Sequence, residues 1–149
     1  MKFLIKPSIK LTALLFALLT SVGTFAATAT AMPRSASSEE ARVYIISPVD
    51  GETVKSPVTV RFGLKGMGVA PAGVDKVNTG HHHLLVDSNK LPPMDQPMGA
   101  DVTHFGAGQT ETTITLTPGS HTLQLILGDK FHIPHNPPVV SEVVHITVK

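Results

Sequence analysis

The sequence contains no cysteine and no tryptophan, and it has a single tyrosine among 149 residues. Without cysteine the chain has no disulfide, no thiolate metal ligand, no cysteine nucleophile and no lipid anchor on an N-terminal cysteine. Burial of apolar side chains must therefore hold the fold together. Charged residues make up only 15% of the chain and form no basic run, so nucleic acid and anionic membrane surfaces are not expected partners.

Residues 1–31 have the layout of a secretory signal peptide. Three lysines precede the uncharged apolar stretch 11–22, and the small residues at 27–31 fit a cleavage site. A spanning helix needs about 20 apolar residues, so we expect no stable membrane insertion after cleavage. The mature chain would keep 12 − 3 = 9 basic and 11 acidic residues, a net charge of 9 − 11 = −2. We expect a periplasmic or secreted protein.

The remaining chain is long enough for one domain with one core. Residues 32–41 are small and polar, and we expect a flexible N-terminal lead there, followed by a single domain at 42–149. Apolar residues recur with period two between Pro and Gly turns, which predicts strands at 43–46, 58–62, 83–86, 110–116, 123–127 and 144–148. Six or seven short strands predict an all-β, antiparallel, immunoglobulin-like β-sandwich. A small barrel fits the same spacing.

Two connections are too long to be plain hairpins, at residues 66–80 and 88–109. A third segment, at residues 128–138, joins the last two strands and is rich in His and Pro. Loops of more than about 12 to 15 residues in a compact domain are usually functional or disordered. The Pro, Met, His and Phe content of the second loop favours a loop that is tied down.

All eight histidines lie beyond residue 80, and six of them are in or beside these irregular segments. Side chains alternate between the two faces of a strand, so His81 and His83 share a face and His82 points away unless a bulge reverses the order. The candidate metal ligands are His81, His83, His104, His132 and His135, with His82 as an alternative. We expect structural or surface roles for His121 and His145. Ordinary hydrogen bonding of loops is the competing interpretation for the candidates.

Copper is the expected metal, before zinc. Imidazole suits both Cu(II) and Zn(II), while the thioethers of Met67, Met94 and Met98 in the long loops are soft ligands that favour Cu(I). Each methionine also fits a role as a gap filler between loops. Asp87, Asp101 and Asp129 could orient imidazoles, although turn formation explains each one equally simply. Neutral imidazole is the ligand, so affinity is expected to fall towards pH 5.

Several longer motifs lie between about Val43 and Lys149. They are SPVDGETVKSPVTVRFGLKGMGVAPAGVDKVNTGHHHLLVD, LPPMDQP, HFGAGQTETT, LTPGSHTLQLILGDKFHIPH and PPVVSE. These motifs resemble those of the DUF4399 family of small exported bacterial proteins. The resemblance places the histidines at 81, 82, 83, 104, 121, 132 and 135 within family motifs and leaves His145 outside them. It implies an exported β-sandwich module and no particular activity.

Two functions remain open from the sequence. The first is a periplasmic protein that binds a transition metal or small ligand through clustered histidines. The alternative is a non-metal ligand- or protein-interaction module of the cell envelope, in which the His-rich loops form a hydrogen-bonded platform. The sequence contains no G-x-S-x-G elbow, phosphate loop or paired catalytic carboxylates, so we expect binding and not catalysis.

Overall fold

The computed structural model describes residues 32–149, and the predicted signal peptide lies outside the described residues. Within residues 32–149 the regular elements are all strands, and no helix there is long and apolar enough to cross a membrane. The strands are β1 (Arg42–Ser47), β2 (Glu52–Val54), β3 (Val58–Lys65), β4 (Gly68–Val69), β5 (Thr79–Val86), β6 (Thr103–His104), β7 (Glu111–Ile114), β8 (Gly119–Gly128) and β9 (Val144–Val148).

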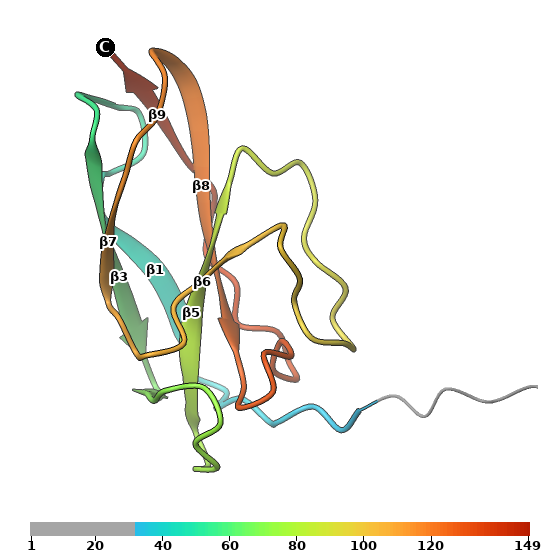
Figure 1. The fold of residues 1–149 in the computed structure, drawn as a ribbon. Helices are drawn as coiled ribbons and strands as arrows, with labels where there is room; N and C mark the ends of the chain where they lie inside the picture. The colour runs from blue at the N-terminus through green and yellow to red at the C-terminus, as the bar shows by residue number, and fades with distance from the viewer. Residues whose placement is uncertain (1–31) are drawn as a thin grey trace, which may run out of the picture.

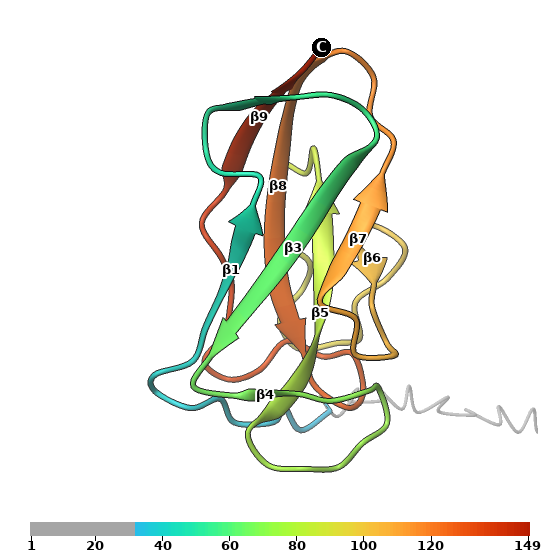
Figure 2. The ribbon, with the colours of Figure 1, turned by 90° about the vertical axis from the view of Figure 1, so that its left-hand side faces the viewer.

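The strands form two sheets that face each other in a sandwich-like arrangement (Figures 1 and 2). The smaller sheet has the order β1-β3-β7, and the larger has the order β2-β9-β8-β5-β4, with β6 paired to β5. Each of the six predicted strands overlaps an observed one, and the all-β prediction is confirmed. The sheets are not wholly antiparallel as predicted, because β2 pairs with β9 and β4 pairs with β5 in parallel. The short strands β2, β4 and β6 were not predicted, because two or three residues carry too little periodicity to be recognised.

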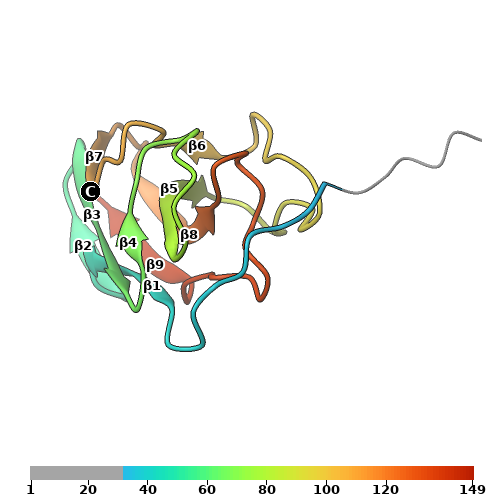
Figure 3. The same ribbon diagram turned by 90° about the horizontal axis from the view of Figure 1, so that it is seen from below.

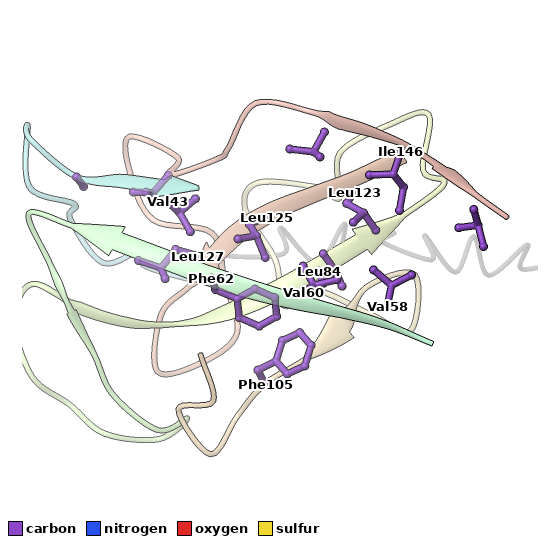
Figure 4. Packing of buried hydrophobic residues seen from close by; sticks show 14 residues of the cluster. Val43, Val58, Val60, Phe62, Leu84, Phe105, Leu123, Leu125, Leu127 and Ile146 are labelled. Atoms are coloured by element: carbon purple, nitrogen blue, oxygen red, sulfur yellow. The ribbon is translucent and has the colours of Figure 1, made fainter. Parts of the chain in front are cut away.

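The main core fills the space between the two sheets (Figure 4). Val58, Val60 and Phe62 point inward from β3 and alternate with exposed residues, as their period of two predicts. Leu123 and Leu125 of β8 meet them from the larger sheet and are fully buried. Burial of each such side chain stabilises the fold by about 1.5–3 kcal/mol.

The outer face of the larger sheet is also covered, by loops and not by a third sheet. The long connection after β5 and the segment after β8 lie on this side, opposite the smaller sheet (Figure 1). A second apolar cluster fills the space beneath them, formed by Leu85, Ile126 and Val102 with Met94, Met98 and Val140 packed around it. Strand β5 is therefore buried on both faces, and its outward-facing residues lie under these loops.

Candidate metal centre

The three consecutive histidines of β5 divide between the two faces of the larger sheet. His82 points into the main core, where its ring lies 5.2 Å from the ring of Phe62. His81 and His83 point to the outer face, with ring centroids 4.7 Å apart. The predicted alternation is confirmed, and the alternative in which a bulge turns His82 towards the site does not occur.

Two further histidines reach the same place from different loops. His104 belongs to β6, which pairs with β5 so that His104 is directly opposite His83. His132 lies in the loop after β8, at a left-handed backbone conformation with φ of 65°. All six pairs of rings among His81, His83, His104 and His132 have centroids between 4.4 and 6.1 Å apart.

These four rings can each offer one nitrogen so that all four nitrogens lie within 4.8 Å of one another. A tetrahedral ion with metal–nitrogen bonds of 2.0–2.1 Å needs nitrogens about 3.3 Å apart. His81 Nε2 and His132 Nδ1 are already 3.1 Å apart. Side-chain movements of about 1.5 Å or less would bring the remaining nitrogen pairs to this spacing around one ion.

The site is buried at its base and open at its rim. His81 and His83 are each only 1% exposed, whereas His132 is half-buried and His104 is exposed. The base has room for both rings because β8 ends in Gly128, opposite His81. A Cβ atom at Gly128 would lie 2.6 Å from Cε1 of His83 and 2.8 Å from Cε of Met98. The missing side chain at Gly128 is therefore a requirement of the site.

Burial keeps the base histidines neutral. Desolvation, reinforced by repulsion from His104 and His132, lowers the pKa of His81 to about 4. Desolvation and then the neighbouring His81 lower the pKa of His83 to about 3. Desolvation and the nearby His132 also lower the pKa of His104. Neutral imidazole is the form that binds metal, so at neutral pH His81, His83 and His104 are in the ligating state.

The ring nitrogens of the base find almost no hydrogen bonds. Within residues 32–149, His81 Nδ1 and both nitrogens of His83 make no hydrogen bond of normal geometry. Buried polar groups in proteins are nearly always paired, and an unpaired one costs about 1–3 kcal/mol. Both nitrogens of His82 are unpaired too, among apolar side chains, so lack of a partner does not by itself define a ligand. Convergence with three other rings distinguishes His81 and His83.

Family comparison matches this chain to "Domain of unknown function (DUF4399)" over residues 60–149, more than half of its length. The protein belongs to the DUF4399 family. The matched segment begins later than the resemblance seen in the sequence, yet it contains all four histidines of the cluster. Searches among curated proteins and among solved structures found no match.

The structure does not bring His135, the fifth predicted ligand, into this group of four. Its ring is fully buried, with Nε2 3.1 Å from the carbonyl oxygen of Thr79 and Nδ1 3.4 Å from that of Leu127. The His132–Ile133–Pro134–His135 spacing does not direct both rings to one side, because the left-handed turn at His132 separates them. His135 instead ties the start of β5 to the end of β8.

His121 and His145 lie outside the four-histidine group and pair with carboxylates. His121 Nδ1 is 2.7 Å from Asp87 Oδ2, and its Nε2 is 2.8 Å from the carbonyl oxygen of Thr117. Both partners only accept, so this geometry requires a doubly protonated ring, and the bond to Asp87 raises the pKa of His121. His145 is exposed and lies 3.1 Å from Asp50.

Asp129, for which the sequence offered both turn formation and the orientation of an imidazole, is a buried carboxylate. A Gly-Asp pair at a strand end predicts a turn, and the structure does form one there. The carboxylate, however, is 1% exposed, and its negative charge acts on His81 in the direction that raises the histidine pKa. It therefore supplies a buried anion next to a proposed cation site. Only the contact with distant parts of the chain reveals this role.

Proposed function

We propose that this protein is an exported, immunoglobulin-like β-sandwich that binds one transition-metal ion through His81, His83, His104 and His132. The observation that carries the proposal is the convergence of four ring nitrogens within 4.8 Å, two of them from buried rings. Four imidazoles complete a tetrahedral shell, which is the arrangement of a binding site without an open catalytic position. Export rests on the signal-like layout of residues 1–31.

Copper is the preferred ion and zinc the second. A site of four nitrogen ligands binds Cu(II) more tightly than Zn(II) in the general order of divalent metals. Met98 lies beside the base of the site, and its N–H donates to the carbonyl oxygen of His132 at 3.0 Å. A thioether next to the imidazoles adds a soft group that suits Cu(I).

The alternative, a hydrogen-bonded platform for a non-metal ligand or protein, fits the base of the cluster less well. Such a platform needs ring nitrogens that a ligand or protein surface can reach, whereas His81 and His83 are each only 1% exposed. A single cation is small enough to reach them and would pair with one nitrogen of each ring.

Calorimetric titration of the untagged chain starting at Met32 tests the proposal. At pH 7.5 we expect one equivalent of Cu(II), and more weakly of Zn(II), to bind with a Kd below about 10 µM, a free energy stronger than about −7 kcal/mol. His104→Ala is expected to weaken binding by at least tenfold. His145→Ala, a matched change at an exposed histidine outside the cluster, is expected to leave it unchanged. Failure of every ion to bind would remove the proposal.

A further inference from the structure

The N-terminal residues just before the sandwich lie along the loop that carries His132 (Figure 3). Ala36 forms a parallel bridge with Asn136, whose N–H donates to the carbonyl oxygen of Ser35 at 2.9 Å. Arg34 donates through Nε to the carbonyl oxygen of Pro134 at 2.9 Å and through Nη2 to that of His135. Residues 34–37 belong to the segment expected to be a flexible lead. They are hydrogen-bonded to the loop after β8 that carries His132.

Ser35 also reaches the buried Asp129 that shapes this loop. Asp129 Oδ2 accepts the Ser35 N–H at 3.1 Å and the Ser35 hydroxyl at 2.9 Å. Its other oxygen, Oδ1, accepts the N–H groups of Phe131 at 2.9 Å and Ile133 at 3.1 Å. These two amides flank His132. One carboxylate therefore connects the N-terminal segment to both neighbours of a proposed ligand.

We propose that Ser35, acting through Asp129, positions His132 for metal binding, so that docking of residues 34–37 and occupation of the site favour each other. This inference rests on the proposed metal-binding function. Ser35 is a positioning residue and touches no ligand. Coupling of this kind is reciprocal: a docked segment raises metal affinity by the same factor by which bound metal favours docking.

The coupling follows from the cost of leaving Asp129 without its partners. A buried carboxylate is tolerated when it is fully hydrogen-bonded, and undocking of Ser35 removes two of its four donors. The carboxylate then turns towards water and releases Phe131 and Ile133. His132 adopts a left-handed conformation that a residue with a side chain rarely adopts, so without this support its backbone relaxes and its ring leaves the group.

Three single substitutions in the chain separate positioning from plain stability. Ser35→Ala removes the hydroxyl that contacts Asp129 and is expected to weaken Zn(II) and Cu(II) binding about tenfold, as loss of groups that orient metal ligands commonly does. Ser37→Ala is the matched control, since the Ser37 hydroxyl donates to Pro137 at 2.8 Å and makes no contact with Asp129. It is expected to change the affinity less than twofold. Ser35→Thr keeps the hydroxyl and is expected to restore affinity to within about threefold.

Amide hydrogen exchange supplies the second measurement. In the metal-free protein, Ser35→Ala is expected to speed exchange at Phe131 and Ile133 at least fivefold, and Ser37→Ala is not. In the wild type, bound Zn(II) is expected to slow exchange at Asn136, whose N–H donates to Ser35. Ser35→Ala with unchanged metal affinity would overturn the inference, even if the protein were less stable. Absence of any metal binding would refute the proposed function. Equal exchange rates at Phe131 and Ile133 in the two alanine variants would refute the link from Ser35 through Asp129 to His132.

Discussion

Acidification from pH 7 to pH 5 is expected to destabilise the metal-free protein, and His81 and His83 together contribute about 4 kcal/mol of this effect. In the unfolded chain a histidine titrates near pH 6.5. In the folded protein burial lowers the pKa of His81 to about 4 and that of His83 to about 3. Between pH 7 and 5 the unfolded chain therefore gains protons that the folded protein does not.

The sign and the size follow from proton linkage. Stability falls with decreasing pH wherever the unfolded state binds more protons, and one unit of pKa difference corresponds to about 1.4 kcal/mol. His81 and His83 each contribute about 2 kcal/mol over this range. Asp129 has a pKa below the usual range of an aspartate, so its titration lies outside this window. The lowered pKa values of His82 and His104 act in the same direction as those of His81 and His83, whereas the raised pKa of His121 acts in the opposite direction.

Urea unfolding at pH 7 and pH 5, with a chelator present, measures the effect. Far-ultraviolet circular dichroism is the suitable signal, because the chain has no tryptophan. His83→Gln cannot take up a proton and is expected to reduce the loss of stability between pH 7 and pH 5 by about 2 kcal/mol. His145→Gln makes the same change at an exposed histidine outside the cluster and serves as the matched control. Equal pH dependence in His83→Gln and the wild type would refute the reasoning.

Three further substitutions test the site and its surroundings. Gly128→Ala places a Cβ atom 2.6 Å from the ring of His83. Calorimetry is expected to show at least a tenfold loss of metal affinity, and urea unfolding a loss of about 1–3 kcal/mol in the free energy of unfolding. His135→Gln is expected to lower the free energy of unfolding by about 1–3 kcal/mol through its buried hydrogen bonds while metal affinity changes less than twofold; a large loss of affinity would return His135 to the ligand set. His121→Gln removes a group with a raised pKa. The stability that this group adds is complete below pH 6.5 and is lost as pH rises through the pKa of the folded protein. Urea unfolding should therefore show a larger loss of stability in His121→Gln at pH 6 than at pH 9.

The strand pattern and the shared face of His81 and His83 could be predicted because both depend on local geometry, whereas His104 and His132 were candidates only because they lie in His-bearing irregular segments. Period-two spacing identified the long strands, and the same alternation placed His81 and His83 on one face. The positions of His104 and His132 depend on contacts between distant segments. His104 is set by β6, a strand of two residues, and His132 by a left-handed turn, and neither leaves a periodic signal in the sequence.

The role of the N-terminal segment could not be predicted for a related reason. Residues 34–37 look small and polar, which is the composition of a flexible lead. Their hydrogen bonds go to backbone groups of residues 134–137 and to Asp129, about a hundred positions away. Such contacts depend on the position of the loop after β8 in the folded protein, which the composition of residues 34–37 does not reveal. The same distance explains why Asp129 resembled an ordinary turn residue.

The stability lost by burying His81 and His83 with unpaired nitrogens indicates that these two histidines have a function. Leu85 lies on the same outer face of β5 as His81 and His83 and is 2% exposed within an apolar cluster. An apolar side chain therefore fits this face without leaving unpaired nitrogens. His83 instead leaves both ring nitrogens without a partner in the described chain, which lowers stability at neutral pH and more so in acid. Such a cost persists at sites where the side chain is needed for binding, because a bound ion would coordinate one nitrogen of each ring that the fold leaves unpaired. The burial that destabilises the metal-free protein is thus the same property that keeps the imidazole neutral and ready to bind a metal ion.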